Sequence, residues 1–497
     1  MFNQDTARKQ ETPDMVNEQE SQQIGMNKAR FFGHATRFFQ YHLPTEYVLL
    51  GVIEYIVLFI SFYLGLFLRF HGTAGEMQLG NYDTSAVVYS LIMQLSLIAF
   101  GAYQRRSRQP IEMVTLRIAG SLGVGMVAQS LTFYVFPALF LGRGVIGLSF
   151  IISFVLIMSV RLAYRSIDES RDLRLRVLVL GAGKNASLIT RAQSEGALSG
   201  VCIVGFVPML KDGDSSIESD IVTPQGRLIN YVADNQIDQI VLAADERRKG
   251  LPVQDLLDCK MSGVEVIDLP SFFERETGQI RLDILQPSWL FLSEGFGVSA
   301  FRLIKKRLFD ITIVLLMLPL VLPIMLVSAL AVLLDNKGKG GILYRQIRVG
   351  KNGQLFEILK FRSMVVNAEE DGKARWASTD DKRVTRVGAV MRKYRLDELP
   401  QFFNILKGEM SFVGPRPERP EFVKELAENI PYYNERHRVK PGLTGWAQIR
   451  YPYGASIEDG KRKFQYDLYY VKNYSNFFDA FVLLQTAEAV LFGKGAR

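Results

Sequence analysis

The sequence contains little cysteine and histidine, and this scarcity excludes several classes of protein. Only two cysteines, Cys202 and Cys259, occur among 497 residues. Both lie in segments with the composition of a folded core, so we expect no disulfide framework and favour a reducing compartment. The four histidines are scattered, and no His/Cys cluster has metal-ligand spacing, which argues against a zinc site. A GxxxxGK[ST] loop is also missing, which disfavours an ATP-driven protein.

The first 27 residues lack an apolar run and are rich in Gln, Asn, Glu and Asp. This composition does not fit a secretory signal peptide, and we expect residues 1–40 to form a disordered cytosolic tail. The chain is too long for one compact core, which predicts two to four domains. Its net charge of +8 fits a protein that meets anionic lipid, phosphorylated substrates or nucleic acid.

Long apolar stretches follow the tail, over residues 47–68, 86–103, 118–141 and 145–164. Each is close to the roughly 20 residues that a membrane-spanning helix needs. They predict a four-helix transmembrane bundle within residues 41–168. A soluble helical core is the alternative, which four successive runs disfavour. Glu54 lies inside the first stretch, where a charge facing lipid is costly, so we expect it to face other helices.

The basic residues beside these stretches predict their orientation. They concentrate before the first stretch, between the second and third, and after the fourth, whereas the other two connections carry few. The positive-inside rule therefore predicts that the tail and everything after residue 165 lie in the cytoplasm. The three clusters are Lys28, Arg30 and Arg37; Arg105, Arg106 and Arg108; and Arg161, Arg165, Arg171 and Arg174.

A fifth apolar run, over residues 305–336, differs from the others because it is basic at both ends. Equal positive flanks favour both ends on the cytoplasmic face. Pro319 and Pro323 lie in its middle, where they remove helical hydrogen bonds and permit a sharp kink. We therefore predict a re-entrant membrane helix, a helix–break–helix that dips into the bilayer and returns. An ordinary fifth span is the alternative.

Residues 172–292 have the pattern of a Rossmann-like α/β domain. A leucine-rich strand near Leu173 leads into a glycine turn and a helix-like stretch, and three later apolar segments predict further strands of a parallel sheet. Gly181, Gly183 and Ala186 match the dinucleotide fingerprint only in part, and the second strand ends without the acid that would bind a ribose. We therefore favour a structural or regulatory domain over a nucleotide site.

The stretch "YRLDELPQFFNILKGEMSFVGPRPERP" places Asp397 and Glu398 just before Pro400. As neighbours on one helix they would point about 100° apart and would not form a same-face acid pair. Pro400 suits the first turn of a helix, whose N-terminal dipole would favour ionised carboxylates. Such carboxylates among bases could hold Mg²⁺ or attack phosphorus, and a capped surface helix with ion pairs is an equally weighted alternative. The local bases are Arg392, Lys393, Arg395, Arg416 and Arg419.

A series of motifs spans residues 305–497: "KKRLFD" leading to Pro323, "YRQIRVG", "LKFRSM", "RLDELPQFFNILKGEMSFVGPRP", "KPGLTGWAQ" and "YDLYYVKNYS". In number, length and order they resemble the bacterial polyprenyl-phosphate sugar-1-phosphate transferases, the monotopic phosphoglycosyl transferases. The four spans and the Rossmann-like domain resemble the large multi-domain form of that family. The finer resemblance is to exopolysaccharide undecaprenyl-phosphate glucose phosphotransferases of the exosortase-associated type.

The resemblance implies a mixed α/β catalytic domain over residues 301–497 and a ping-pong reaction. Asp397 matches the nucleophile, which would attack a UDP-sugar and release UMP, and Glu398 matches its partner in the dyad. The phosphosugar, by the family's pattern often glucose-1-phosphate, would pass to undecaprenyl phosphate, as the initiating step of exopolysaccharide or capsule biosynthesis. Mg²⁺ would screen the diphosphate, with Asp397 as its candidate ligand. The candidate phosphate-binding residues are Lys360, Arg362, Arg392, Arg395, Arg416 and Lys440.

Two positions depart from the family's pattern. The membrane kink has Leu322 before Pro323 where Ser is frequent, which puts a kink-fixing hydroxyl bond in doubt. Lys440 stands where Arg is common, which keeps the charge and loses the planar fork. The expected partners are a UDP-sugar, undecaprenyl phosphate and the lipid bilayer, without nucleic acid; a homodimer is compatible with them. The expected location is the bacterial inner membrane, multi-pass, with the soluble domains facing the cytoplasm.

Two other functions compete with this prediction. A membrane-attached NAD-dependent nucleotide-sugar dehydratase should carry a Tyr with Lys four residues on, and no tyrosine here has that spacing. A non-catalytic scaffold or regulator of polysaccharide assembly would fit a degenerate dyad, whereas Asp397 and Glu398 are both present.

Overall fold

The computed structural model describes residues 45–491 with several gaps. The gaps are 71–81, 100–110, 141, 170–173, 199, 210–216, 218–219, 247–249, 294, 298, 337–339, 366–382, 452–453 and 455. The predicted tail and most of the basic residues that predict orientation therefore lie outside the described residues. Contacts divide the chain into two compact units, which are described separately below. One contains residues 175–187 and 202–267, and the other contains residues 51–174, 188–201 and 268–497.

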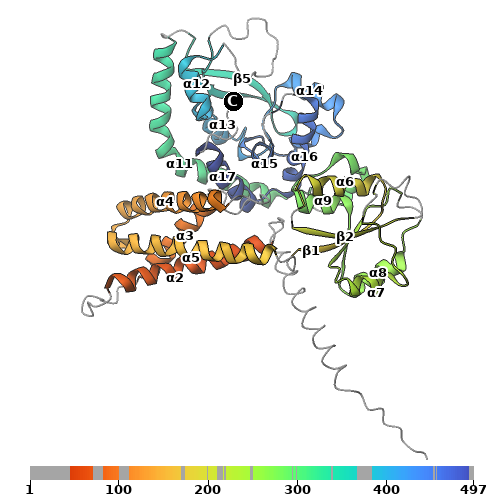
Figure 1. The fold of residues 1–497 in the computed structure, drawn as a ribbon. Coiled ribbons are helices and arrows are strands. Elements are labelled where there is room, and N and C mark those ends of the chain that lie inside the picture. The colour runs from red at the N-terminus through yellow and green to blue at the C-terminus, as the bar shows by residue number, and fades with distance from the viewer. Residues whose placement is uncertain are drawn as a thin grey trace, which may run out of the picture. The chain divides into compact units, whose positions relative to one another are not determined.

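Four helices form the bundle that the sequence predicts: α2 (Thr45–Phe70), α3 (Asp83–Ala99), α4 (Ile111–Val135) and α5 (Arg143–Glu169). Figure 1 shows them side by side, coloured red to yellow. Their shared core contains Leu58, Tyr89, Met93 and Leu122, all buried. Among the described residues, four helices are long and apolar enough to cross a membrane, namely α2, α4, α5 and the later α11, while α3 is apolar but shorter. These helices confirm the prediction of a membrane protein.

Glu54 faces the interior of this bundle, as the cost of a lipid-facing charge predicts. Its side chain is fully buried. Arg161 of α5 donates through Nε to Oε1 and through Nη2 to Oε2, the latter over 3.0 Å. Because both oxygens are matched by the guanidinium fork, the buried charge is compensated within the bundle.

A four-stranded sheet forms the centre of the other unit. Its strands are β1 (Leu175–Leu180), β2 (Val201–Val207), β3 (Gln239–Leu242) and β4 (Glu265–Asp268), in the order β2-β1-β3-β4, with β1 and β3 parallel. The accompanying helices are α6 (Lys184–Ser194), α7 (Leu228–Asp234) and α8 (Val253–Met261). Figure 1 shows α7 and α8 together, and residues of β1, β3, α7 and α8 share one hydrophobic core. All four strands occur where the sequence predicts them.

The helix α9 (Leu269–Thr277) packs with the C-terminal part of the chain, although the sequence assigns it to the Rossmann-like segment. Its buried Glu274 accepts hydrogen bonds from Lys472 Nζ at 2.6 Å and Asn473 Nδ2 at 2.9 Å. Trp446 Nε1 donates to the carbonyl of Gly278. Gly278 is the C-cap residue of α9 and has the left-handed backbone conformation. The turn η2 (Leu282–Ile284) and the helix α10 (Pro287–Leu292) follow.

The helix α11 (Ala300–Asp335) continues through Pro319 and Pro323 as one helix, so the predicted division into two separate helices is wrong, while the kink and the re-entry stay predictions. Each proline removes one N–H, and the four-residue spacing confines the loss to the carbonyls of residues 315 and 319. An apolar helix tolerates this local loss because its other hydrogen bonds remain internal. Two basic side chains fix its start to the C-terminal part: Lys306 bonds Asp479 at 2.6 Å, and Arg307 donates to the carbonyls of Ile405 and Leu406.

The C-terminal part opens with a hairpin of β5 (Leu343–Val349) and β6 (Leu355–Phe361), which pair antiparallel. The turn η3 (Lys351–Gly353) joins them, with Asn352 at φ 55°. The remaining elements are α12 (Arg386–Lys393), η4 (Leu396–Glu398), α13 (Gln401–Lys407), β7 (Ser411–Val413), α14 (Pro420–Asn429), η5 (Tyr433–Arg438), β8 (Gly442–Thr444), α15 (Trp446–Arg450), α16 (Ile457–Asn473) and α17 (Asn476–Leu491). The short strands β7 and β8 pair in parallel.

Candidate active site

The two neighbouring carboxylates lie in the short turn η4, not in the helix that follows. Arg395 precedes the turn in the left-handed conformation, with φ 55° and ψ 24°. Pro400 stands immediately before α13, as the sequence predicts. However, the N–H groups of Phe402 and Phe403 donate to the carbonyls of residues 399 and 400. These N–H groups are therefore satisfied by backbone, and the predicted stabilisation of the carboxylates by the helix terminus is wrong.

Glu398 is instead held by cations. Its Oε1 accepts from Lys360 Nζ at 2.9 Å and from Arg416 Nη2 at 3.2 Å. Arg395 Nη1 lies 3.8 Å from Oε2. Burial alone would raise the pKa of this carboxyl group, but Lys360 and Arg416 outweigh it and hold the pKa far below the ordinary value. Glu398 is consequently an ionised group that fixes two cations in place at neutral pH.

Asp397 has the opposite environment. Its side chain is 8% exposed, and among the described residues no hydrogen bond or ion pair engages its oxygens. Burial raises its pKa, the charge of Glu398 adds to the rise, and Lys360 opposes it. A carboxylate that is poorly solvated and free of hydrogen bonds is more basic and more nucleophilic than one at a surface.

The cations beside the dyad are positioned by buried polar contacts. Asn404 of α13 donates to the carbonyl of Glu357 at 2.7 Å and accepts from the N–H of Leu359 at 3.0 Å, which holds β6 and therefore Lys360 against the dyad. Both polar ends of the Asn404 side chain are thus used to join α13 to β6. We expect this lock to fix the distance between Lys360 and Glu398.

Arg416 is fixed from the other side. Its Nη1 donates to Gln448 Oε1 at 3.3 Å, and its carbonyl accepts from Arg436 Nη2 at 3.0 Å. Arg436 also binds the buried Asp467, with Nη2 2.8 Å from Oδ2. Burial raises the pKa of Asp467 to about 6, although Arg436 opposes the rise. The prolines on either side of Arg416 therefore act together with a buried ion pair that the sequence did not indicate.

The other predicted phosphate-binding residues do not all join the dyad. Arg392 lies near enough to lower the pKa of Asp397, and its Nε donates to Ser363 Oγ at 3.0 Å. Arg362 donates to the carbonyl of Gly341 at 3.2 Å and lies over a tyrosine ring, and in the described part of the chain it makes no hydrogen bond or ion pair with the dyad. Lys440 lines a different cavity, and Pro323 lies within α11. The structure thus brings together Lys360, Arg392, Arg395 and Arg416.

The sequence missed three donors near the dyad. Gln401 and Arg348 line the cavity that also contains Glu398, Lys360 and Arg416. Gln401 Nε2 and Arg348 Nε are buried without a hydrogen-bond partner among the described residues, as is Gln448 Nε2. Buried donors of this kind are costly unless a ligand or water engages them. Each stands inside a motif that the sequence singled out, but an amide or arginine carries no spacing signal of its own.

A divalent metal has one candidate ligand in this site. Within the described residues, no group of three or more His, Cys, Asp or Glu side chains could hold a metal ion. Glu398 is engaged by its cations, which leaves Asp397 as the available carboxylate. Mg²⁺ commonly uses one or two carboxylates together with substrate phosphates, so this donor set fits an ion shared with a diphosphate but not an all-protein cage.

The glycine turn after β1 is occupied by the chain itself. Asp245 accepts from the N–H groups of Lys184 and Asn185, at 2.9 and 2.8 Å, at the start of α6. A Cβ on Gly183 would lie 2.2 Å from Asp245 Oδ2. A dinucleotide pyrophosphate would need these N–H groups and the space above this glycine. The geometry therefore agrees with a structural or regulatory role and disfavours the dehydratase alternative.

Comparison with known proteins gives consistent matches. Residues 301–493 match the family model described as bacterial sugar transferase. The chain is 41% identical over 242 residues to UDP-N-acetylgalactosamine-undecaprenyl-phosphate N-acetylgalactosaminephosphotransferase of Aeromonas hydrophila, over 49% of this chain and 56% of that protein. It is 32% identical over 339 residues to undecaprenyl-phosphate glucose phosphotransferase of Komagataeibacter xylinus, over 66% and 61% of the two chains.

A third relative is covered more completely. The chain is 30% identical over 374 residues to UDP-glucose:undecaprenyl-phosphate glucose-1-phosphate transferase of Xanthomonas campestris pv. campestris, over 71% of this chain and 75% of that protein. The chain thus spans little more than half of the first two relatives and three quarters of the third. The names of these three relatives differ in the sugar, which is glucose in two cases and N-acetylgalactosamine in the other.

Proposed function

Because this chain belongs to the bacterial sugar transferase family, we propose that it transfers a sugar-1-phosphate from a UDP-sugar to undecaprenyl phosphate. The products are undecaprenyl-diphospho-sugar and UMP, and the reaction initiates an exopolysaccharide or capsule chain. One observation carries the proposal: a buried carboxylate that no described residue bonds, Asp397, stands beside a carboxylate that holds two cations, Glu398. A phosphoryl-transfer site needs this combination of nucleophile and fixed positive charge.

The proposed chemistry has two balanced steps. An oxygen of ionised Asp397 forms a bond to the sugar-bearing phosphorus, and the bond from that phosphorus to the bridging oxygen breaks, so that UMP leaves with the electron pair. An oxygen of undecaprenyl phosphate then bonds to the same phosphorus, and the bond to Asp397 breaks. No oxidant or reductant is needed, and Asp397 is regenerated ionised.

The cations act on the charge that moves during these steps. Lys360 and Arg416 lie on one side of Glu398, 2.9 and 3.2 Å from its Oε1, and their positive charges would stabilise phosphoryl oxygens bound there. Glu398 keeps the two cations in place and prevents them from pairing with Asp397. Mg²⁺, when bound, supplies further charge screening of the donor diphosphate. The buried donors of Gln401 and Arg348 suit oxygens of the bound donor substrate.

We place the site at the cytoplasmic face of the bacterial inner membrane. UDP-sugars are cytosolic, and the acceptor phosphate lies at the headgroup level of the inner leaflet. We propose that α11 follows a re-entrant path by bending at Pro319 and Pro323 within one continuous helix, because it contacts α12, α13, β7 and α17 of the same part of the chain. Its start is fixed there by Lys306, and β5 of the same part follows eight residues after its end. A full span would carry the end of α11 across the bilayer, away from these contacts.

The experiment that tests the proposal supplies the purified chain with undecaprenyl phosphate and a panel of UDP-sugars, and measures UMP. The panel contains UDP-glucose, UDP-galactose, UDP-N-acetylglucosamine and UDP-N-acetylgalactosamine. We expect UMP release with at least one donor, and we propose glucose as the sugar. Absence of UMP with all four donors, in a preparation that is folded and contains Mg²⁺, contradicts the proposed reaction. Faster release with UDP-N-acetylgalactosamine would change the sugar and leave the reaction class intact.

A further inference from the structure

A second cavity of about 270 Å³ lies beside the start of α11 and apart from the dyad. No lining residue is shared between this cavity and the one at the dyad. The two are nevertheless near in the chain, because Lys440 lines the second cavity and Gly442 lines the first. Its lining residues are Leu303, Ile304, Lys306, Arg307, Asp310, Lys351, Val439, Lys440 and Tyr474.

Three of the charged groups around this cavity are already engaged. Lys306 Nζ is 2.6 Å from Asp479 Oδ2 and 3.1 Å from the carbonyl of Val413. Arg307 donates to two backbone carbonyls at the end of α13, at 2.5 and 2.6 Å. Asp310 accepts from Ser411 Oγ at 2.9 Å and from the N–H of residue 412 at 3.0 Å. These groups build the walls and have little capacity left for a ligand.

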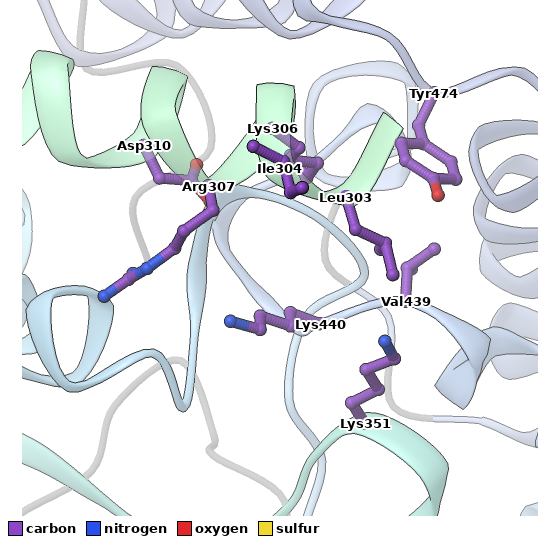
Figure 2. A pocket seen from close by; sticks show the side chains of 9 residues that line it. All are labelled: Leu303, Ile304, Lys306, Arg307, Asp310, Lys351, Val439, Lys440 and Tyr474. Carbon is purple, nitrogen blue, oxygen red and sulfur yellow. The ribbon is translucent and has the colours of Figure 1, made fainter. Parts of the chain in front are cut away.

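Lys351 and Lys440 are different, because neither ammonium group has a hydrogen bond or ion pair among the described residues. Figure 2 shows both side chains in the space between η3 and α11, with Leu303 and Val439 beside them. Burial lowers the pKa of Lys440, and the charge of Arg307 lowers it further. The region therefore carries positive charge that its own carboxylates do not balance, and an anion bound in this cavity would be attracted by both lysines.

The rest of the cavity is apolar and lies where α11 begins its exposed hydrophobic surface. Leu303 and Ile304 contribute to the lining, and both are exposed, as is Leu308 one turn further on. The apolar face continues through the exposed Leu315 and Leu316. A helix with basic residues at its start and an exposed apolar face beyond them meets the bilayer at the headgroup level. A ligand here would present a phosphate to the lysines and hydrocarbon to the leucines.

We propose that this cavity binds the phosphate group of a membrane lipid, with Lys351 and Lys440 as its cationic ligands and Leu303, Ile304 and Val439 against the adjoining acyl or prenyl chain. The lipid is either a bilayer phospholipid or the polyprenyl phosphate, which share this chemistry. Such a site would hold a lipid phosphate in a cavity that shares no lining residue with the cavity at the dyad. The inference rests on membrane contact and not on the transfer reaction, so the two can fail separately.

The test measures lipid binding by the purified full chain in a neutral detergent. The probes are dihexanoyl phosphatidylglycerol, undecaprenyl phosphate and inorganic phosphate, and the readout is isothermal titration calorimetry. The variant K351Q/K440Q removes both charges, and Lys424→Gln makes the same kind of change on the exposed face of α14 as a matched control. Each single variant, Lys351→Gln and Lys440→Gln, is included in case the double variant does not fold.

We expect K351Q/K440Q to bind at least one lipid probe about tenfold more weakly, or roughly 1.4 kcal/mol, and Lys424→Gln to bind as the unchanged chain does. Loss for phosphatidylglycerol identifies a phospholipid site, and loss for undecaprenyl phosphate alone identifies an acceptor site. Inorganic phosphate should bind more weakly than either lipid, because it makes no apolar contact. Unchanged lipid binding by the folded variants overturns the proposal, and so does binding of inorganic phosphate as tight as that of the lipids.

A second readout separates this inference from the proposed reaction. UMP release from a UDP-sugar without acceptor depends on the dyad and needs no lipid phosphate. We expect Lys351→Gln, whose residue is not among the candidate phosphate-binding residues of the reaction, to retain this release. If the unchanged chain releases no UMP but the variant loses lipid binding, the proposed reaction fails and the lipid site stands.

Discussion

Two turns of this chain could each hold an anion, and the aspartates in these two turns have opposite hydrogen-bonding environments. In the glycine turn after β1, Asp245 accepts hydrogen bonds from two backbone N–H groups at 2.8 and 2.9 Å. In the turn η4, Asp397 is buried and no described residue bonds to it. A satisfied carboxylate stabilises the fold and closes a site. A buried carboxylate that the fold leaves unsatisfied is costly, and such cost is typical of functional positions.

The largest expected effect follows from replacing each aspartate by asparagine. Asp397→Asn removes the nucleophile, and we expect kcat for UMP release to fall by more than about 1,000-fold. Asp245→Asn makes the same chemical change in a turn that we consider structural, and it should leave kcat within about twofold. Steady-state UMP release by both variants, with the same donor and acceptor, measures the comparison. Equal losses in the two variants would contradict the division between an active turn and a structural one.

The next effect concerns the partner carboxylate. Glu398→Gln leaves Lys360 and Arg416 without their shared anion, and they are then free to pair with Asp397. We expect kcat to fall by about 100-fold, because a nucleophile paired with cations is less reactive and the cations no longer face the phosphate. Gln254→Ala, on an exposed face of α8, is the control for a polar change elsewhere. Activity of Glu398→Gln within threefold of the unchanged chain would show that Glu398 does not organise the site.

The sequence identified these carboxylates but did not predict the hydrogen bonds and charges that surround them. Motifs identified Asp397, Glu398 and Arg416, and hydrophobic runs predicted the bundle and the four strands of the sheet. The roles of Asp245 and Asn404 could not be predicted, because each depends on contacts with residues about 45 to 60 positions away along the chain. A local pattern carries no information about such distant partners.

The same limit explains the sequence predictions that were wrong. Pro319 and Pro323 indicated a break in α11, but helix continuity depends on the hydrogen bonds that remain, and these suffice. Pro400 indicated a helix terminus that would stabilise the carboxylates, but backbone carbonyls of the preceding turn occupy the N–H groups of Phe402 and Phe403. In both cases the residue type was informative and its hydrogen-bond partners were decided by the fold.

Replacing Asp397 or Asp245 by asparagine should change the unfolding temperature in opposite directions. The folded protein raises the pKa of Asp397, so it binds this proton more tightly than the unfolded chain does. Ionised Asp397 therefore costs stability at pH values above its folded pKa, and the cost disappears as the pH falls below its ordinary pKa. We expect Asp397→Asn to raise the unfolding temperature by roughly 2–4 °C at pH 7.5, with a gain that shrinks toward pH 4.

Asp245→Asn should instead lower the unfolding temperature, because the charged acceptor of two N–H groups is lost, at a cost of about 1 kcal/mol. Differential scanning fluorimetry in one detergent measures both variants across this pH range. A decrease in both variants at pH 7.5 would mean that Asp397 has stabilising partners after all.

The smallest expected effect concerns Arg362, which the sequence predicts to bind phosphate but which the structure does not bring into contact with the dyad. Arg362 donates to the carbonyl of Gly341, whereas Arg416 contacts Glu398. Arg362→Gln should change kcat/KM by less than about threefold, while Arg416→Gln should lower it by more than about 30-fold. Donor titrations of the two variants provide the comparison. A loss in Arg362→Gln as large as that in Arg416→Gln would bring Arg362 back into the phosphate site.

The most direct test of the central claim is to incubate the chain with a UDP-sugar without acceptor and to measure UMP and intact mass. The account predicts close to one equivalent of UMP per active chain and a mass increase equal to one sugar phosphate, located by peptide mass spectrometry at Asp397. Asp397→Asn should show neither. UMP release only when acceptor is present, without any adduct, would contradict a nucleophilic Asp397 and indicate direct transfer between the two substrates.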